Sequence, residues 1–508
     1  MSGRRLVTMN GTTATAPLNR PTVPLRTARP SRKRLWQAGF GLLAVLALVL
    51  LYLVLPGQEG GLPPHGRIAL VIFAAAVLAW MFARVDDTFV GLLAAVALVV
   101  TGVIDADTLF GALGGETVWL LIGAFVLAAG LAATGLPERA AVVLVARARS
   151  VRQLAHLVTV AVAGTALAVP ATSGRAALLL PVFLALARAL AGRPSVVRAL
   201  ALLFPTVILL SAAATLIGAG AHLITSQVLA GATGAGIGFG RWLLLGLPFA
   251  LLSSHLAAEL VLLLMTSRAD RRLPLSLDVS DFTDLAGRTG VAATGPLSAG
   301  QKRAAVVLAA VVLLWCTESL HGLAPALVAL LGALLITAPR LGTTAVGGAL
   351  ATVPWSLLLF MTTTAVLGTA LSASGAAAWL TGLAFGHGGA GGAPGFLVTV
   401  VVLSAAAHLV LQSRSARSSV LVPLVIPPAI AFGLNPAAVA FASTVAAGFC
   451  HTLPASAKPV ALFSALEDVP TYRRSDLLRL SALLGPVVVL LVLGFAVTVW
   501  PALGLPLR

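Results

Sequence analysis

The chain has 508 residues, of which 59% are hydrophobic and only 10% are charged. A soluble domain normally carries about a quarter charged residues, so this composition excludes an ordinary soluble fold and indicates a protein whose solvent is lipid. The net charge of +17 does not indicate nucleic-acid binding, because the basic residues lie in a tail and in short segments between apolar runs. We therefore expect a multi-pass membrane protein without a nucleic-acid partner.

The chain begins with a basic segment, residues 1–35, that contains no acid. Its length, and the spanning length of the apolar run that follows it, distinguish it from a cleaved signal peptide. We expect residues 1–35 to form a disordered cytoplasmic tail.

Apolar runs long enough to cross a bilayer as helices follow one another along the rest of the chain. We predict about eleven membrane-spanning helices, at approximately 36–55, 67–83, 88–104, 117–134, 198–230, 240–265, 303–318, 323–338, 355–373, 436–465 and 478–499. Two other apolar stretches, 153–188 and 394–433, are too long for one span and have polar residues at their centres. They predict re-entrant helical hairpins, whose non-helical tips must be covered by protein or by a water-filled cavity.

The basic residues between these runs predict an orientation. With the tail inside, the inside loops carry Arg84, Arg139, Arg147, Arg149, Arg152, Arg268, Arg271, Arg272, Arg288, Lys302, Arg340, Arg473 and Arg474. The outside loops, 56–66, 105–116, 231–239, 319–322 and 374–393, contain no Lys or Arg. Because basic loops stay on the cytoplasmic side, we expect a protein of the inner (plasma) membrane with a cytoplasmic N-terminus and an external C-terminus.

The two halves of the chain resemble each other. The segment from Arg175 to Pro181 matches the segment from Arg417 to Pro423, and each lies in a predicted hairpin. In the predicted topology the copies lie on opposite sides of the membrane. We therefore predict an all-α fold built as an inverted repeat, with a first half 36–265, a cytoplasmic linker 266–302 and a second half 303–508. Such repeats with interrupted helices are typical of secondary transporters, whose site lies at the repeat interface.

Polar residues at the two hairpin tips are the first candidate site residues: Thr172, Ser173 and Arg175 in the first, and Ser413, Arg414, Ser415 and Arg417 in the second. A charge at membrane depth is costly and usually marks a pathway. Helix N-termini, hydroxyls and guanidinium groups all favour anions. The alternative is that these arginines lie near the surface and extend to water. The equivalent positions of Arg175 and Arg417 favour an anion site.

Two helix breaks follow the hairpins, at residues 215–222 and 452–459, and they add Gly218, His222, Pro454 and Lys458 to the candidate site. Glycine and proline inside a span free backbone groups that can line a site. Lys458 has no obvious acidic neighbour, and a bound anion would supply one. His222 is either a ligand contact or proton carrier, or a hydrogen-bonded core histidine.

His255 and Glu259 lie one helical turn apart and are either a proton relay or a structural pair. The isolated cysteines Cys316 and Cys450 predict no disulfide framework or metal site. No catalytic or nucleotide-binding motif is present, so we expect neither an enzyme nor an ATP-driven pump.

At these residues the chain resembles the divalent anion:sodium symporter family of the ion transporter superfamily, over about residues 67–500. The run from Thr117 to Arg139 resembles the span that leads into the first hairpin of that family. The family's Ser-Asn-Thr motif at each tip corresponds here to 171–173 and 413–415, and its broken helices correspond to 218–222 and 456–460. The resemblance implies a scaffold domain, a transport domain that holds both hairpins, a homodimer and an elevator-like motion.

The chain departs from the family at the tips. Both motif asparagines are replaced, by Thr172 and Arg414, and arginine stands two places after each motif, as Arg175 and Arg417. In the family, sodium ions bind here beside a dicarboxylate, and an arginine would repel them. We therefore expect no cofactor, and we hypothesise a sodium-independent secondary transporter of small di- or multivalent anions, of the dicarboxylate, citrate or sulfate class.

Two alternatives stay open. One is a degenerate transporter that acts as a membrane anion sensor or scaffold, which the loss of the sodium ligands would favour. The other is a transporter of the arsenite or citrate branches, which share the fold. The sequence does not name the anion or the coupling.

Overall fold

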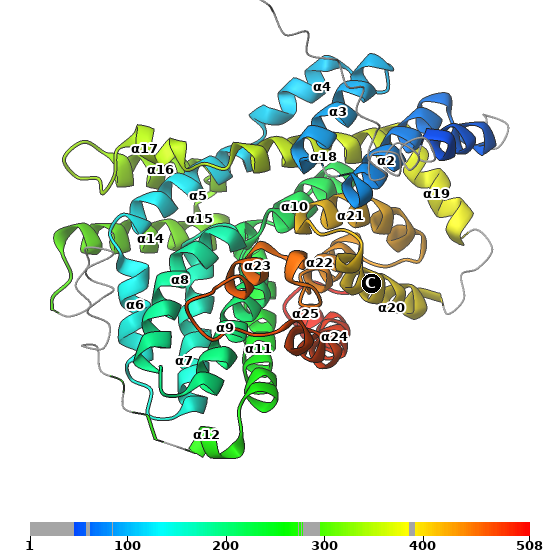
Figure 1. Cartoon of the computed structure of the whole chain (residues 1–508). Coiled ribbons are helices and arrows are strands. Elements are labelled where there is room, and N and C mark those ends of the chain that lie inside the picture. Colours follow the sequence, from blue (N-terminus) through cyan, green and yellow to red (C-terminus); the bar gives the residue numbers. More distant parts are fainter. Residues whose placement is uncertain are drawn as a thin grey trace, which may run out of the picture. The chain divides into compact units, whose positions relative to one another are not determined.

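The computed structural model describes residues 45–56, 61–83, 85–272, 274–275, 277, 295–385 and 392–508 (Figure 1). The predicted tail 1–35, Arg84 and Arg288 lie outside the described residues, as do parts of the linker 266–302. We describe the compact unit that extends from Leu50 to Arg508. The described residues of this unit form helices, turns and loops. They also contain an isolated antiparallel β-bridge between Ser150 and Pro274.

The first half of this unit is a succession of helices. They are α2 (Pro64–Phe82), α3 (Asp87–Val100), α4 (Ala106–Gly111), α5 (Glu116–Ala132), α6 (Leu136–Val145), α7 (Val151–Gly164), α8 (Thr172–Ala189), α9 (Pro194–Ser211), α10 (Gly220–Thr233) and α11 (Phe239–Met265). The short α12 (Arg268–Arg272) follows. Between them lie the 3-10 turns η2 (Ala112–Gly114), η3 (Thr165–Leu167), η4 (Ala212–Ala214) and η5 (Leu216–Gly218).

The second half repeats this order. It contains α14 (Ala299–Cys316), α15 (Glu318–His321), α16 (Pro325–Thr337), α17 (Val346–Ala351), α18 (Trp355–Ala373), α19 (Ala376–Phe385), α20 (Gly392–Ala406), α21 (Arg414–Ala431), α22 (Pro436–Ala447), α23 (Lys458–Ser464), α24 (Arg474–Val497) and α25 (Val499–Ala502). Its 3-10 turns are η7 (Ala407–Leu409) and η8 (Pro454–Ser456). The corresponding helices α8 and α21 both have 18 residues. The internal repeat seen in the sequence is thus also a repeat of structural elements.

Both predicted hairpins appear as two helices joined by a short non-helical tip. The stretch 153–188 contains α7, η3 and α8, and the stretch 394–433 contains α20, η7 and α21. Nine helices in the described part of the chain are long and apolar enough to cross a membrane, including α8 and the segment from α20 to η7. The all-helical, polytopic fold class is confirmed, whereas the number of spans stays a prediction.

Several predicted loops contain short helices instead. Among them, the segments 105–116, 137–152 and 374–393 hold α4, α6 and α19, respectively. α6 follows a left-handed Gly135, has a proline and a glutamate in its first turn, and buries Ala141, Val142 and Val145 on one face. Proline and acid in the first turn are helix-start signals, but a segment this short cannot span a membrane, so hydropathy alone does not predict this helix.

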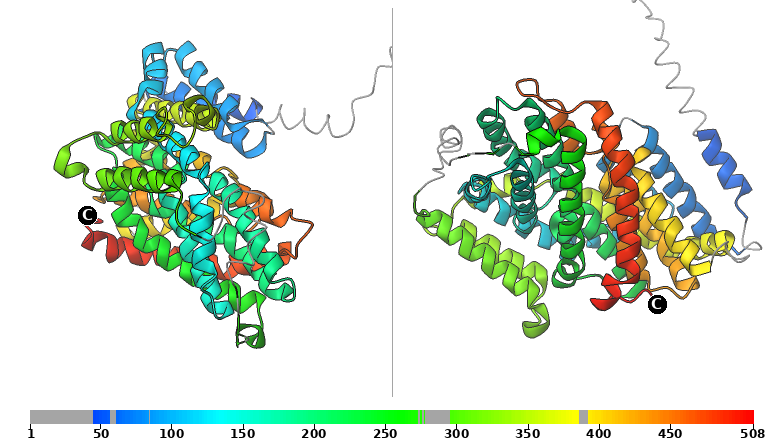
Figure 2. Two further views of the ribbon diagram at one scale, coloured as in Figure 1. Left: turned by 90° about the vertical axis from the view of Figure 1, so that its left-hand side faces the viewer. Right: turned by 90° about the horizontal axis from the view of Figure 1, so that it is seen from below.

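The two halves pack against each other in a crossed manner. α5 packs against α16 and α18 packs against α3, while α10 packs against α21 and α23 packs against α8 and α9. The second segment of each broken helix therefore lies against the hairpin of the other half. α11 and α24, which are equivalent in the repeat, lie side by side (Figure 2). This crossing brings the two hairpin tips to one place.

The predicted spans 198–230 and 436–465 are each broken. α9 ends at Ser211 and α10 begins at Gly220, while α22 ends at Ala447 and α23 begins at Lys458. α9 is almost wholly buried, as expected for a helix that is apolar all round. A helix that ends inside the protein leaves carbonyl groups without intrahelical partners, and these must be satisfied by other groups.

Candidate functional site

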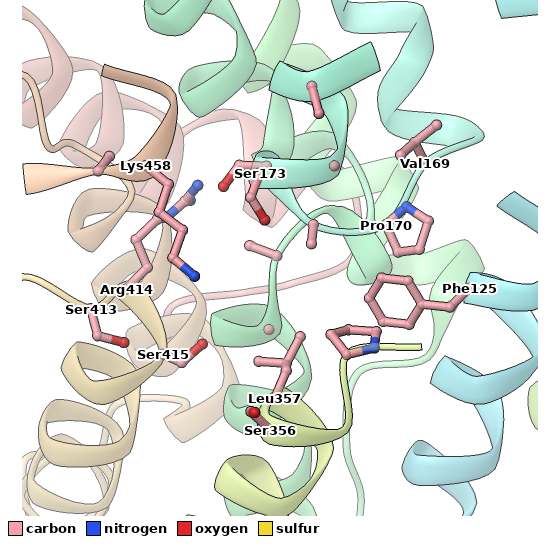
Figure 3. Close-up of a pocket in the computed structure, with 18 of the residues that line it drawn as sticks. Phe125, Val169, Pro170, Ser173, Ser356, Leu357, Ser413, Arg414, Ser415 and Lys458 are labelled. Atoms are coloured by element: carbon pink, nitrogen blue, oxygen red, sulfur yellow. The ribbon is translucent and has the colours of Figure 1, made fainter. Parts of the chain in front are cut away.

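A cavity of about 1000 Å³ lies where the two hairpin tips meet (Figure 3). The tips contribute residues 169–174 and 412–415, and the helix breaks contribute 219–220 and 456–458. The opposite side is formed by residues 86–88 at the start of α3 and by parts of α5 and α18. The cavity is therefore built from both halves of the repeat.

Six of the eleven predicted site residues line this cavity: Thr172, Ser173, Ser413, Arg414, Ser415 and Lys458. The other five do not line it: Arg175, Arg417, Gly218, His222 and Pro454. In the sequence, residues that line the cavity and residues that do not lie in the same segments. Only the fold decides which of their side chains face the cavity.

Two long helices begin at the cavity with free backbone N–H groups. α8 starts at Thr172 and α10 starts at Gly220, and neither has a side chain that caps its N-terminus. The third, α21, is capped by Ser413, whose hydroxyl accepts a hydrogen bond from the Ala416 N–H at 3.3 Å. Free N–H groups and the positive end of the helix dipole favour an anion in this cavity.

Two basic side chains, Arg414 and Lys458, reach the same space from the second half (Figure 3). Arg414 Nη1 donates a long hydrogen bond of 3.5 Å to the Leu209 carbonyl, and its Nε is buried without a hydrogen-bond partner in the described part of the chain. Lys458 is exposed, and its ammonium makes no hydrogen bond or ion pair with a described residue. A buried donor without a partner is costly, so Arg414 is poised for an acceptor, and Lys458 adds a positive charge to the same space.

Arg175 lies behind the first tip, fully buried and away from the cavity lining. Its guanidinium donates four hydrogen bonds: Nε to Thr165 Oγ1 (2.9 Å), Nη1 to the Ile208 carbonyl (3.0 Å), and Nη2 to the Val162 carbonyl (2.7 Å) and Ser211 Oγ (2.7 Å). These oxygens lie at the C-terminal ends of α7 and α9 and in η3. Arg175 thus satisfies exposed helix ends, where a positive charge is stabilised by the helix dipole.

Arg417 occupies the equivalent place in the second half, also fully buried. Its Nη1 donates to the Ala447 carbonyl at 2.7 Å and to the Phe449 carbonyl at 3.1 Å, at the end of α22. Its Nε and Nη2 have no partner among the described residues. Both arginines therefore hold the C-terminal end of a broken helix rather than facing the cavity.

The remaining predicted residues shape the helix breaks. At Gly218 a Cβ atom would lie 2.1 Å from the Ala212 carbonyl oxygen, so only glycine fits there. Nδ1 of His222 donates to the Thr215 carbonyl at 2.9 Å, and its ring stacks on Trp242 at 4.9 Å. These contacts favour the hydrogen-bonded core histidine, but its Nε2 is buried without a partner among the described residues. Pro454 begins η8 and lies outside the lining.

Three acidic residues that we did not predict also line the cavity: Asp86, Asp87 and Glu138. Asp86 caps α3, and its carboxylate accepts from the N–H groups of Thr88 at 2.9 Å and Phe89 at 3.3 Å. Burial raises the pKa of the Glu138 carboxyl, and Oε2 of this residue is buried without a hydrogen-bond partner in the described part of the chain. An N-cap signal precedes α3 in the sequence, but nothing there indicates that these acids face the tips.

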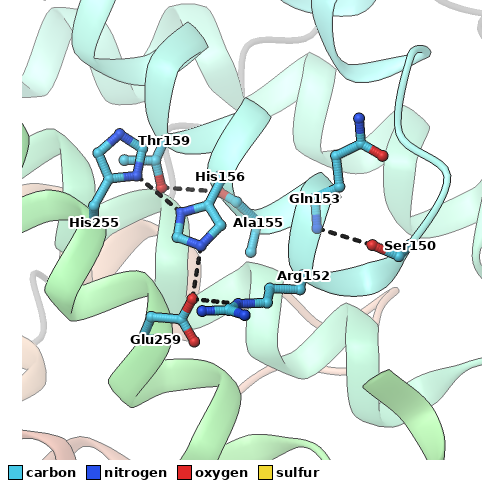
Figure 4. Close-up of polar contacts among 8 residues, drawn as sticks. All are labelled: Ser150, Arg152, Gln153, Ala155, His156, Thr159, His255 and Glu259. Carbon is cyan, nitrogen blue, oxygen red and sulfur yellow. Dashed lines mark hydrogen bonds and ion pairs between the residues drawn. The ribbon is translucent and has the colours of Figure 1, made fainter. Parts of the chain in front are cut away.

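A second polar cluster lies away from the cavity and joins α7 to α11 (Figure 4). Oε1 of Glu259 accepts from Arg152 Nε at 2.6 Å and from His156 Nε2 at 2.7 Å. Nδ1 of His156 lies 2.9 Å from Nδ1 of His255. His255 and Glu259 are thus joined through His156 of the neighbouring helix and not by a direct hydrogen bond, and both the structural unit and the proton relay stay open.

Comparisons with known proteins agree with this architecture. A family model described as the sodium:sulfate symporter transmembrane region matches residues 35–505. A relative from Cupriavidus necator, named as a membrane protein, is 28% identical over 415 residues, which cover 76% of this chain and 78% of the relative. The crystal structure of the Alcanivorax borkumensis YdaH transporter superposes with a TM-score of 0.50 and 20% identity, covering 79% of this chain and 90% of that chain.

At 20% identity the structural likeness shows the fold alone, which is that of a membrane transporter. The family model, in contrast, covers nearly the whole chain, from the residue before the first predicted span to six residues past the last. The resemblance to the divalent anion:sodium symporters is confirmed, and the chain belongs to the family of the sodium:sulfate symporter transmembrane region.

Proposed function

We propose that this protein is a secondary transporter of small anions with two or more negative charges, of the dicarboxylate, citrate or sulfate class. The observation that carries the proposal is the shared cavity, in which uncapped helix N-termini meet the side chains of Arg414 and Lys458. Serine hydroxyls at 173, 413 and 415 supply further donors. A dianion placed between the tips would accept hydrogen bonds from these groups.

The second part of the proposal is that guanidinium groups replace bound sodium. The four acceptors of Arg175 are two carbonyl and two hydroxyl oxygens, the kind of ligand that a hard cation takes. Arg417 holds two carbonyl oxygens at the equivalent helix end. The positive charge that an ion would bring is thus built into the chain at both positions. Transport would then proceed as exchange, as uniport or in a proton-linked manner.

We also propose the cytoplasmic N-terminus that the distribution of basic loops predicts, together with the homodimer and the elevator-like motion that the family resemblance implies. In such a motion the hairpins would move with the cavity relative to α3, α5 and α18. The crossed packing of α10 on α21 and of α23 on α8 supports this, because it ties the tips and the broken helices into one body.

Uptake of labelled succinate, citrate and sulfate into proteoliposomes, with and without a sodium gradient, tests the proposal. The wild type would be compared with Lys458→Ala and Arg414→Ala. Lys302→Ala is the matched control, since Lys302 is exposed and lies outside the cavity. We expect sodium-independent uptake that both cavity variants lose and the control keeps.

Each other result has a definite meaning. Uptake that strictly requires sodium would overturn the replacement of sodium by arginine but leave an anion transporter. If an anion stabilises the protein but none of the three anions is taken up, the result would favour a degenerate transporter that acts as a membrane anion sensor. Uptake of all three anions that is unaffected in both cavity variants would place the anion site elsewhere.

A further inference from the structure

Glu138 is the third residue of α6 and lines the same cavity as the hairpin tips. One of its carboxylate oxygens, Oε2, is buried and has no hydrogen-bond partner among the described residues. The preceding helix, α5, contributes only Phe125 and alanines to the cavity lining and therefore supplies no donor there. A buried carboxylate oxygen that receives no hydrogen bond favours the neutral, protonated form of the acid.

The other two acids of the cavity differ from Glu138 in this respect. The Asp86 carboxylate accepts hydrogen bonds from the N–H groups of Thr88 and Phe89, and such bonds favour the ionised form. Asp87 has no buried carboxylate oxygen without a partner; among the described residues that are not exposed, Glu138 is the one acid in that state. Burial accordingly raises the pKa of the Glu138 carboxyl.

The charged groups on α6 and on the helices packed against it are engaged elsewhere. Arg139, the next residue, donates to the Pro296 carbonyl at 3.3 Å and to Gln301 Oε1 at 3.2 Å. No ion pair joins Glu138 to a basic residue in the described part of the chain. α6 packs against α5, α7 and α8. These helices carry Glu116 at the start of α5, Arg152 and His156 bound to Glu259, Arg175 bound to four oxygens, and Arg188 in the last turn of α8.

We propose that Glu138 is a proton-binding site that couples proton movement to anion transport. The inference rests on the proposed function and selects proton-linked transport among its possible modes. A bound dianion and an ionised Glu138 in one cavity repel each other, so a proton on Glu138 strengthens anion binding. By reciprocity, a bound anion strengthens proton binding to the same degree.

The position of α6 makes this coupling useful for transport. α6 packs against α7 and α8, which are the two helices of the first hairpin. The proton is thus held on a helix that lies against one of the two tips, and the anion is held by groups at the other, Arg414 and Lys458. A proton gradient directed inward would then drive accumulation of the anion.

Binding measurements on the purified full-length protein test the inference. Isothermal titration with sulfate, which stays a dianion throughout, would be carried out at about pH 5 and about pH 8. The wild type should bind sulfate about fivefold or more tightly at the lower pH, as expected for coupling between two sites. Glu138→Gln should bind equally well at both, as tightly as the wild type at low pH, because glutamine resembles the neutral acid. Glu138→Ala, a second variant without the carboxyl, should also lose the pH dependence.

Two further variants control for other titrating groups. Glu116→Gln makes the same chemical change at an exposed residue outside the cavity and should keep the pH dependence of the wild type. Asp87→Asn removes another acid of the lining. Loss of the pH dependence in Asp87→Asn but not in the Glu138 variants would assign the proton to Asp87 and overturn the inference.

A second measurement follows the proton itself. When sulfate is added to the protein in weakly buffered solution with a pH indicator, the wild type should take up protons and Glu138→Gln should not. In proteoliposomes, an inward proton gradient should accelerate sulfate uptake by the wild type but not by Glu138→Gln. Proton uptake and gradient-driven transport that persist in Glu138→Gln would exclude Glu138 as the proton site.

Arg414→Ala and Lys458→Ala separate this inference from the proposed function. If both weaken sulfate binding while the wild type and Glu138→Gln show the same pH dependence, or none, the proton site is excluded and the anion site stands. If both bind sulfate, succinate and citrate as the wild type does, or if no variant binds any of these anions at either pH, the proposed function fails and the inference fails with it.

Discussion

Replacement of Arg175 by serine offers a direct test of the idea that guanidinium groups occupy sodium positions. The change removes four hydrogen bonds of 2.7–3.0 Å from a fully buried site. It leaves a polar void surrounded by two carbonyl and two hydroxyl oxygens. A serine hydroxyl adds a further oxygen beside them.

The loss of stability in Arg175→Ser depends on which of the four oxygens keep another hydrogen-bond donor. The Val162 carbonyl still receives the Thr165 hydroxyl at 2.6 Å, and Ser211 still donates to the Val207 carbonyl. The Ile208 carbonyl retains no other side-chain donor among the described residues, and leaving one buried acceptor unsatisfied costs about 1–3 kcal/mol. With the lost packing of the side chain, we expect a destabilisation of about 2–4 kcal/mol.

Arg417→Ser should cost less, about 1–2 kcal/mol. Arg417 makes two hydrogen bonds, and its Nε and Nη2 are already without partners among the described residues. The two variants thus form a matched pair at equivalent positions, with Arg175→Ser the more destabilised.

The assay is thermal unfolding of the purified variants in sodium chloride and in choline chloride of equal ionic strength. If the vacated oxygens accept sodium, the ion stabilises Arg175→Ser by mass action, by about 1.4 kcal/mol at ten times its dissociation constant. The wild type should show no such difference between the two salts. Equal stability of Arg175→Ser in both salts would refute the substitution of a guanidinium for a sodium ion.

Three further predictions concern other parts of the protein. Gly220→Ala should lower anion uptake into proteoliposomes without abolishing it, because its Cβ would lie 2.9 Å from the Ser415 hydroxyl and 2.8 Å from a methyl group of Leu357, and both side chains line the cavity and would have to shift. Glu259→Gln should lower the free energy of unfolding by less than about 1 kcal/mol, since the ion pair is partly exposed, and should leave the pH profile of uptake unchanged. Glu138→Gln should raise the melting temperature at pH 7 more than at pH 4. Because burial raises the pKa of the Glu138 carboxyl, the folded state favours its neutral form, and stability falls as pH rises above the ordinary value of 4.5.

Each of these has a control and a contrary outcome. Gly231→Ala meets no atom closer than 3.9 Å and should transport normally; equal loss in both glycine variants would contradict the steric argument. A shifted pH profile in Glu259→Gln would instead support a proton relay. For Glu138, the exposed Asp107→Asn is the control, and a pH-independent difference from wild type would show that burial of the carboxyl is not the cause.

Much of the fold follows from the sequence by itself. The apolar runs, the polar centres of the two hairpins and the match between the segments at 175–181 and 417–423 predict a helical membrane protein with an internal repeat. These features can be predicted because helix length, hydropathy and chain breaks are local properties. The short helices α4, α6 and α19 cannot be predicted in this way, because none of them is long enough to span a membrane.

The composition of the cavity was decided by the tertiary structure. Sequence reasoning treated Arg175, Arg414 and Arg417 alike, yet only Arg414 faces the cavity, while the other two turn toward free carbonyls at helix ends. Nor does the sequence indicate that Asp87 lines the same cavity as Ser413, more than three hundred positions away. The direction in which a side chain points depends on which helix ends pack beside it, and that is a property of the crossed packing of the two halves.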